Sequence, residues 1–288
     1  MLDKVKIIEC PRDAMQSIKT FIPTNTKLSY LQSVVDVGFD VVDIGSFVSP
    51  KAIPQLSDTS IIIDSIDLSN SNSELLVIVA NKLGAINASK FDKIDYLGYP
   101  FSISENFQMR NTNKTIKDSE KELAEIISIA EKVNKKVVVY LSMCFGNPYG
   151  DPWNLDIVNH WVYKLSKMGV KIISLSDTIG TSNPESIKSI FYSVLKNHID
   201  IEFGAHLHSD PSTWYNKIHS AFEAGCRRFD GAIKGFGGCP MASNKLVGNM
   251  PTEKILSYLN SKKIHNNVSS LRFESCYNQS LEVFNKFH

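Results

Sequence analysis

The feature that most constrains the fold of this chain is a repeated alternation of short apolar segments with longer amphipathic ones. Short β-branched runs favour buried strands, and runs with apolar residues three and four positions apart favour helices. The alternation is typical of βα units around a parallel sheet. Strands are expected at 5–9, 41–44, 75–79, 94–97, 137–142, 172–175, 201–206 and 228–232. Helices are expected at 27–37, 57–66, 82–90, 117–133, 155–168, 184–196, 212–224 and 252–259.

Eight such units in 288 residues predict an α/β fold, a single (β/α)8 TIM barrel. Helix boundary signals support this reading. The pair Asn183-Pro184 offers an N-cap followed by a proline at the first helical position. The three glycines Gly38, Gly169 and Gly225 each follow a predicted helix, where a left-handed residue commonly ends it.

The competing architecture is a doubly wound open sheet. That fold usually carries a G-x-G-x-x-G turn after its first strand, whereas the first strand here leads into Cys10-Pro11-Arg12-Asp13. The barrel domain is expected to span residues 1–260. The polar remainder, 261–288, contains one short amphipathic piece at 281–284 and is expected to be a C-terminal extension packed on the barrel or on a partner.

Composition narrows the class of partner. Hydrophobic residues make up 43% of the chain and charged residues 21%, which disfavours disorder. With 31 Lys+Arg against 30 Asp+Glu and no long run of one sign, nucleic acid and membrane partners are not expected, and a small molecule is favoured. The five cysteines are scattered without a C-x-x-C pair, and no apolar leader opens the sequence, so a cytoplasmic location is expected.

Polar residues gather where the predicted strands end. Barrel active sites are built at the carboxyl ends of the strands, so this distribution predicts a single site at one mouth of the barrel. The residues at these ends are Arg12 and Asp13, Asp43, Ser142, Asp177, His206 and His208, and the loop from Gly235 to Cys239.

The pair His206 and His208 is the strongest single signal. Side chains alternate along a strand, so both imidazoles are expected on one face, while Phe203 and Leu207 point toward the helices. Two histidines on one face at a strand end favour metal binding. A pair of hydrogen-bonded core histidines is the alternative, although a second buried imidazole adds a desolvation cost without improving packing.

The choice of metal follows from the other ligands. Asp13 is the best placed carboxylate, at the end of the first strand, and the amide oxygen of Asn249 could add a further ligand, although Gly248-Asn249 is also an ordinary turn. Two imidazoles with oxygen ligands suit Mg²⁺ or Mn²⁺, and a site without further oxygen ligands suits Fe²⁺.

Two further residues at the predicted mouth are candidates for a catalytic role. The guanidinium of Arg12 can hold a carbonyl oxygen that becomes an enolate, or it can form a salt bridge with Asp13 or Asp43. Cys239 lies on a glycine-rich loop and could act as a general acid or base, although the glycines can also simply make a turn.

Taken together, these motifs resemble the hydroxymethylglutaryl-CoA lyases, which belong to the DRE-type TIM-barrel metallolyases. The resemblance runs from about residue 6 to 253 and is specific in combination rather than in any one motif. It rests on Pro11-Arg12-Asp13-Ala14-Met15-Gln16, Ser46-Phe47-Val48-Ser49-Pro50-Lys51, Ser176-Asp177-Thr178-Ile179-Gly180, His206-Leu207-His208, Gly237-Gly238-Cys239-Pro240 and Gly248-Asn249.

The resemblance implies a site and a reaction. The reaction is the cleavage of 3-hydroxy-3-methylglutaryl-CoA to acetyl-CoA and acetoacetate, a step of leucine degradation, by a homodimer that takes an acyl-CoA substrate. A divalent cation, Mg²⁺ or Mn²⁺, would be held by Asp13, His206, His208 and Asn249. Catalytic roles fall to Arg12, Asp13, Cys239 and His206, and substrate-binding roles to Arg12, Gln16, Lys19, Asp43, Asn111, Tyr140 and Asp177.

Departures from the family pattern bear on the acyl group. Ala14-Met15 stands where Gly-Leu is usual, and Asp43 where a glutamate is usual. One alternative is therefore a lyase for another 3-hydroxyacyl-CoA. Others are a Claisen condensing enzyme of the same superfamily, whose members generally carry long extra domains, a barrel that binds metal or CoA without catalysis, and a mononuclear iron oxygenase.

Overall fold

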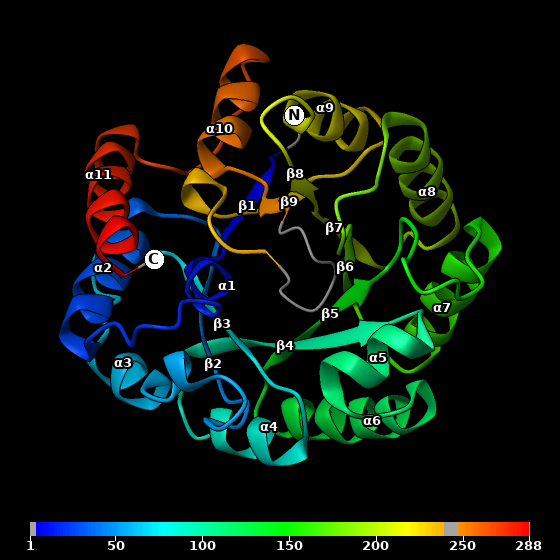
Figure 1. Ribbon diagram of the computed structural model, residues 1–288, viewed down its shortest axis with the longest axis horizontal. Helices are drawn as coiled ribbons and strands as arrows, with labels where there is room; N and C mark the ends of the chain where they lie inside the picture. The colour runs from blue at the N-terminus through cyan, green and yellow to red at the C-terminus, as the bar shows by residue number, and fades with distance from the viewer. Residues whose placement is uncertain (1–3, 239–246, 288) are drawn as a thin grey trace.

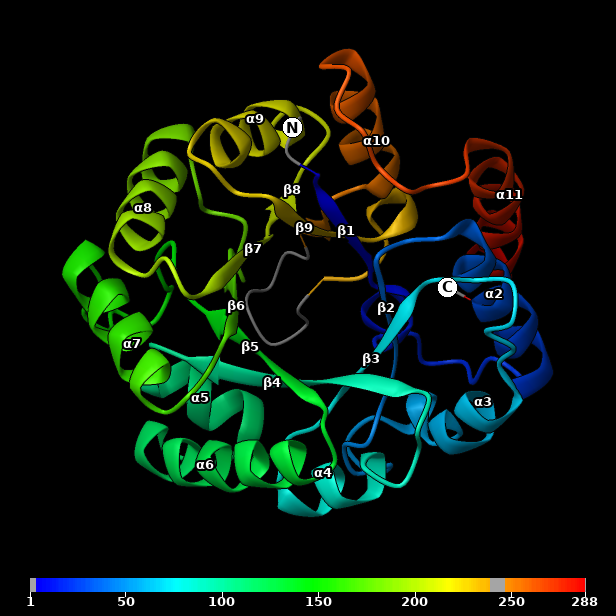
Figure 2. The ribbon, with the colours of Figure 1, turned by 180° about the vertical axis from the view of Figure 1, so that it is seen from behind.

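The computed structural model describes residues 4–238 and 247–287 and is built on a closed barrel (Figures 1 and 2). Its strand order is β1-β2-β3-β4-β5-β6-β7-β9, and all neighbours are parallel. The predicted (β/α)8 barrel is therefore confirmed. The barrel strands are β1 Lys6–Glu9, β2 Val41–Ser46, β3 Glu74–Ile78, β4 Ile94–Ser102, β5 Lys136–Ser142, β6 Ile172–Ser176, β7 Glu202–His206 and β9 Arg228–Gly231.

Helices surround the barrel in a ring (Figure 1) and bury its outer face. The short 3-10 helices η1 and η2 lie in βα loops. The helical segments are α1 Pro11–Met15, α2 Thr24–Val37, η1 Pro54–Leu56, α3 Thr59–Ser65, α4 Lys82–Ala88, α5 Glu105–Thr112, α6 Ile116–Lys132, α7 Leu155–Lys167, α8 Pro184–Asn197, α9 Trp214–Glu223, η2 Ile233–Gly235, α10 Thr252–Ser261 and α11 Ser270–Phe287.

The boundary signals in the sequence are confirmed. Asn183 caps α8, accepting a hydrogen bond from the backbone N–H of Ser186, whose side chain accepts one in return. The glycines after α2, α7 and α9 have φ angles of 88° at Gly38, 96° at Gly169 and 102° at Gly225, which side chains on L-residues disfavour.

The last helix is the largest difference from the sequence-based expectation, which placed only a short amphipathic piece at 281–284. α11 is continuous over Ser270–Phe287 and lies beside α2 in both views (Figures 1 and 2). Phe284 is fully buried, edge-on to Tyr30 of α2 at 5.8 Å and stacked on Phe236 at 4.4 Å between ring centroids. The division of the chain at residue 260 stays a prediction.

A small two-stranded sheet at the barrel mouth was not anticipated. β8 His208–Ser209 pairs antiparallel with β10 Gly248–Asn249, and His208 lies opposite Asn249. Because only Leu207 separates the end of β7 from the start of β8, the chain leaves the barrel between the two histidines. The pairing brings a segment that follows the last barrel strand back over the mouth.

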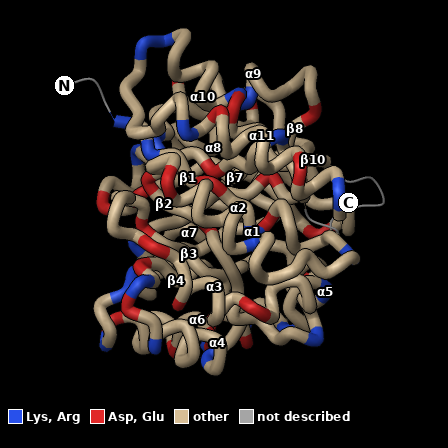
Figure 3. The backbone as a smooth tube through the Cα atoms, turned by 90° about the vertical axis from the view of Figure 1, so that its left-hand side faces the viewer, with Lys and Arg blue, Asp and Glu red and all other residues tan. Residues whose placement is uncertain are grey.

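In the side view, basic and acidic positions are interspersed along the backbone (Figure 3). Among the described helices, none combines the length and the apolar character needed to cross a bilayer.

Candidate metal centre

A cavity opens at the barrel mouth, where the carboxyl ends of the strands meet. Its lining combines charged and polar side chains with apolar ones. The described residues that line it are Arg12, Asp13, Gln16, Val48, Ile53, Ile78, Ala80, Pro100, Phe107, Asn111, Thr112, Tyr140, Ser142, Ser176, Thr178, His206 and His208.

Arg12 and Asp13 reach the cavity because α1 begins directly after β1. Pro11 occupies the first helical position, where its missing N–H costs no hydrogen bond, and both Arg12 and Asp13 of this single turn line the cavity. Both side chains are nearly buried, with 7% of Arg12 and 6% of Asp13 exposed. A turn of five residues thus places a cation and an anion side by side at the mouth.

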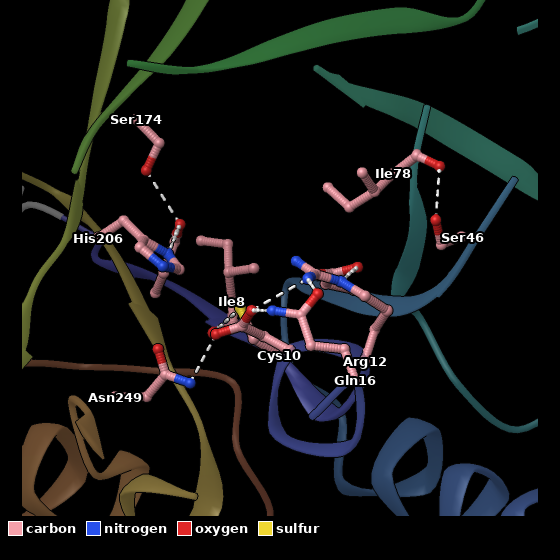
Figure 4. Close-up of polar contacts among 12 residues, drawn as sticks. Ile8, Cys10, Arg12, Gln16, Ser46, Ile78, Ser174, His206 and Asn249 are labelled. Atoms are coloured by element: carbon pink, nitrogen blue, oxygen red, sulfur yellow. Dashed lines mark hydrogen bonds and ion pairs between the residues drawn. The ribbon is translucent and has the colours of Figure 1, made fainter. Parts of the chain in front are cut away.

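The guanidinium of Arg12 joins two carboxylates (Figure 4). Its Nε and Nη2 donate to Asp43 Oδ2 at 3.0 and 2.5 Å, and its Nη1 donates to Asp13 Oδ1 at 3.0 Å. Burial raises the pKa of Asp43 to about 6 despite the charge of Arg12, which still leaves this carboxyl ionised at neutral pH. The salt bridge left open as an alternative in the sequence is therefore present, and Arg12 nevertheless lines the cavity.

The two histidines and Asp13 converge. One ligand atom from each of Asp13, His206 and His208 lies within 4.8 Å of the other two, and the imidazole centroids are 5.5 Å apart. The expectation from strand alternation that both rings share a face is met even though the strand breaks between them. Three donors of this kind at this spacing suit a divalent cation.

Each imidazole is oriented by a bond at Nδ1. His206 Nδ1 lies 3.1 Å from Asp230 Oδ2, which also accepts from Ser174 Oγ at 2.9 Å. His208 Nδ1 lies 2.7 Å from the Asp177 carbonyl oxygen. Bonds of this type fix the tautomer of metal-binding histidines and leave Nε2 for the ion.

The surroundings of His208 Nε2 are the observation that most favours a cation at this site. It is buried and has no hydrogen-bond partner among the described residues. A buried polar atom without a partner is costly, and a metal ion would satisfy it. The residues present therefore fit a divalent cation.

The pKa values of Asp13, His206 and His208 depend on one another and on the neighbouring charges. Burial raises the pKa of Asp13, but Arg12 and the two imidazoles lower it more, so the net pKa lies below its usual value. Burial lowers the pKa of His206, but the hydrogen bond and charge of Asp230 raise it to above its usual value. Burial and the charge of His206 lower the pKa of His208, which favours the neutral imidazole that binds metals.

Asn249 lies beside this group as a donor. Its Nδ2 donates to Asp13 Oδ2 at 2.6 Å and to the Phe236 carbonyl at 2.9 Å. The predicted role of Asn249 as an oxygen ligand thus requires the amide to turn over, so that Oδ1 replaces Nδ2 beside Asp13. Its role in metal binding stays a prediction.

The other predicted site residues divide into two groups. Gln16, Asn111 and Tyr140 line the cavity, and Gln16 Nε2 donates to Asp13 Oδ1 at 2.5 Å. Asp43 lies behind Arg12 and is fully buried. The side chain of Lys19 is exposed and does not contribute to the described lining of the cavity.

Asp177 is not among the described residues that line the cavity. The carboxylate of Asp177 faces Lys217 and Ser182, and it is the backbone carbonyl of Asp177 that reaches the site, through His208. Cys239 lies outside the described residues.

Sequence reasoning missed Asp230 and Lys217, which hold the histidines from behind. Asp230 lies in β9, a short barrel strand with the sequence Arg-Phe-Asp-Gly, and a carboxylate within a predicted barrel strand is a signal that could have been noticed. Lys217 lies within α9 and has no local signal, because its partners come from β8 and from the loop after β6.

Comparisons with known proteins bear on this geometry. A family model described as HMGL-like matches residues 4–278. The chain is 31% identical to a hydroxymethylglutaryl-CoA lyase of Bacillus subtilis, covering 92% of this chain and 88% of that protein. It is 32% identical to a mitochondrial hydroxymethylglutaryl-CoA lyase of Arabidopsis thaliana, again over 92% of this chain, and it spans 56% of that longer protein.

A solved structure agrees with the sequence matches. An HMG-CoA lyase from Acinetobacter baumannii, in complex with coenzyme A and 3-methylmalate, superposes with a TM-score of 0.91 at 27% identity, covering 99% of this chain and 92% of that one. Fold and site thus define a TIM barrel with a candidate metal centre at its mouth. Within that class, the chain belongs to the HMGL-like family.

Proposed function

We propose that this protein is a metal-dependent carbon–carbon lyase that cleaves 3-hydroxy-3-methylglutaryl-CoA to acetyl-CoA and acetoacetate. The observation that carries the proposal is the convergence of Asp13, His206 and His208 beside Arg12 in one cavity. Membership of the HMGL-like family and the names of its relatives support the same activity.

Asp13, His206 and His208 would hold the divalent cation, Mg²⁺ or Mn²⁺, with Asn249 as a further oxygen ligand after its amide turns over. A bound cation of this kind supplies a Lewis acid that polarises substrate oxygens. Asp13 is suited to this role because its low pKa keeps the carboxylate ionised.

Arg12 provides the positive charge that the reaction requires. Removal of the proton from the tertiary hydroxyl of the substrate lets the C2–C3 bond break, C3 becomes the ketone of acetoacetate, and the electron pair passes to C2. The resulting acetyl-CoA enolate carries negative charge on the thioester oxygen. A guanidinium held in place by Asp43 and Asp13 can stabilise that oxygen without rearranging.

Two proton transfers complete the reaction, one from the hydroxyl and one to C2. Cys239 stays the predicted donor to C2. His206 has a predicted role both as ligand and as catalytic group, and both would use Nε2 because Asp230 holds Nδ1. If His206→Ala loses Mn²⁺ binding, Nε2 of His206 is a metal ligand. If His206→Ala still binds Mn²⁺, Nε2 of His206 is assigned to proton transfer.

A second candidate function differs from the first in the acyl group of the substrate. Among the described lining residues Arg12 is the single basic side chain other than the histidines, and it is already paired with two carboxylates. Apolar residues, among them Val48, Ile53 and Phe107, also line the cavity. These features favour, as a second candidate, a 3-hydroxyacyl-CoA with a less polar acyl chain.

The direct test measures acetoacetate release from 3-hydroxy-3-methylglutaryl-CoA by protein stripped of metal, with and without added Mg²⁺ or Mn²⁺. We expect release that depends on the cation. Comparable turnover of straight-chain 3-hydroxyacyl-CoA analogues would support the second candidate. Folded protein that binds Mn²⁺ but releases no product from any of these substrates would overturn the lyase assignment.

Two substitutions separate metal binding from chemistry. His208→Ala removes a ligand, so Mn²⁺ binding and turnover are both expected to be lost. Cys239→Ala is expected to retain Mn²⁺ and substrate binding and to lower kcat by about a hundredfold, as for loss of a general acid. Turnover of Cys239→Ala at the unsubstituted rate would exclude its catalytic role.

The proposal also covers the substrate class, the location, the pathway and the assembly of the enzyme. We infer an acyl-CoA substrate, a cytoplasmic location, a role in leucine degradation and a homodimeric assembly, supported by the family relationship. Sedimentation equilibrium tests the assembly, since a monomer at all protein concentrations contradicts it.

A further inference from the structure

A buried lysine lies behind the candidate metal centre. Lys217 belongs to α9, outside the barrel, and only 3% of it is exposed. Its ammonium donates to Asp177 Oδ2 at 2.7 Å, to the His208 carbonyl at 2.8 Å and to the Gly180 carbonyl at 2.9 Å. Three acceptors match the three N–H groups of the ammonium.

These acceptors belong to the segments that form the metal centre. The backbone carbonyl of Asp177, whose carboxylate binds Lys217, holds His208 Nδ1 at 2.7 Å. His208 is thus held at two points, its ring by Asp177 and its own carbonyl by Lys217. The same ammonium fixes the turn from Asp177 to Gly180, which contains the cavity-lining Thr178.

Lys217 differs from a second buried lysine of the chain in where its partners lie. Burial of an ammonium carries a desolvation cost that a single buried pair often fails to recover. Lys27 of α2 offers a comparison in the same chain, because it is also buried and its ammonium donates to Asp58 Oδ1 at 2.8 Å and to the Gln55 carbonyl. None of the described partners of Lys27 belongs to the candidate metal centre, whereas one partner of Lys217 is His208 itself.

We propose that Lys217 is a positioning residue for the metal centre. Its ammonium locks the backbone of His208 and the turn after β6 together, so that His208 Nε2 faces Asp13 and His206. Lys217 therefore sets the affinity for the divalent cation without touching it. The inference rests on the proposed function in one respect, that the site binds a metal.

The test measures Mn²⁺ affinity in the absence of substrate, from the electron paramagnetic resonance signal of the free ion over metal-stripped protein. Lys217→Met removes the ammonium and keeps an unbranched apolar chain. We expect its Kd for Mn²⁺ to rise by at least about tenfold, the usual effect of losing a partner that orients a ligand. Lys217→Gln, which keeps two N–H donors, is expected to fall between Lys217→Met and the unsubstituted protein.

Lys27→Met is the matched control. It also removes a buried ammonium from a carboxylate, so its thermal stability should fall in a similar way, while its Kd for Mn²⁺ should stay within about twofold of the unsubstituted value. Equal Kd values for Lys217→Met, Lys27→Met and the unsubstituted protein would overturn the proposal and reduce Lys217 to a structural role. If Lys217→Met does not fold, Lys217→Gln decides by the same comparison.

The two proposals fail in different ways. Unsubstituted protein that binds Mn²⁺ without cleaving 3-hydroxy-3-methylglutaryl-CoA would contradict the proposed reaction and leave the role of Lys217 intact. Active protein in which Lys217→Met binds Mn²⁺ normally would contradict the role of Lys217 alone.

Discussion

At the scale of single residues, the mouth of the barrel is organised by charge. Arg12 stands between Asp13 and Asp43, and all three are nearly buried. A buried charge is tolerated only when it is paired, so each member depends on the others. The shape of the guanidinium matters because Asp43 accepts from both Nε and Nη2 of Arg12.

Arg12→Lys tests this dependence. Lysine keeps the positive charge but cannot bridge Asp43 through two nitrogens and still reach Asp13. We expect kcat for acetoacetate release to fall by about a hundredfold, comparable to the loss of a preorganised donor to an oxyanion. Arg272→Lys, an exposed substitution on α11, is the control. A normal kcat in Arg12→Lys would show that charge alone is sufficient.

At the scale of elements, two contacts join the ends of the chain to the site. Glu9, at the end of β1, accepts from the Ile233 N–H of η2 at 2.9 Å and from Thr252 Oγ of α10 at 2.5 Å. Phe284 of α11 stacks on Phe236, which directly follows η2. Both contacts hold the segment where the chain leaves the last barrel strand.

Glu9 makes stability depend on pH. Burial raises its pKa in the folded protein from 4.5 to about 8, with the charge of Glu253 adding to the effect. Between these values the unfolded chain loses the proton and the folded chain keeps it, so this contribution to stability is complete below 4.5 and is lost as the pH rises to about 8. The free energy of unfolding from urea titrations should therefore decrease less over this range in Glu9→Gln. Equal decreases in the two proteins would contradict this prediction.

Phe284→Ala tests the docking of α11. The ring is fully buried between α2 and Phe236, so its removal should lower the free energy of unfolding by about 3 kcal/mol. Leu271→Ala on the same helix is the control, because Leu271 is 80% exposed and should change stability by less than about 0.5 kcal/mol. Chemical denaturation measures both variants, and similar values for the two would mean that α11 contributes little.

At the scale of the whole molecule, the candidate metal centre brings together segments that are distant in sequence. Asp13 follows the first strand, His206 ends β7, and Asn249 returns in β10 after the last barrel strand. A cation held there would link segments more than 200 residues apart in sequence. Binding to the folded state alone stabilises it by mass action.

Thermal unfolding measures this linkage. At a Mn²⁺ concentration a hundred times its Kd, the folded protein should gain about 2.7 kcal/mol, visible as a rise in Tm that a chelator reverses. The rise should be absent in His208→Ala, because that substitution removes a ligand. A rise of equal size in His208→Ala would place the stabilising ion elsewhere.

The chain sequence by itself determined the barrel, the pairing of the two histidines on one face and the position of Asp13, because these depend on local periodicity and on where strands end. It did not determine α11, whose buried residues include Phe284, packed against Tyr30 of α2, because helices in proteins owe most of their stability to tertiary packing. The partners Asp230 and Lys217 were also decided only by tertiary structure. Their bonds to His206 and to Asp177 and His208 join separate elements, and no local pattern specifies which buried charges will meet.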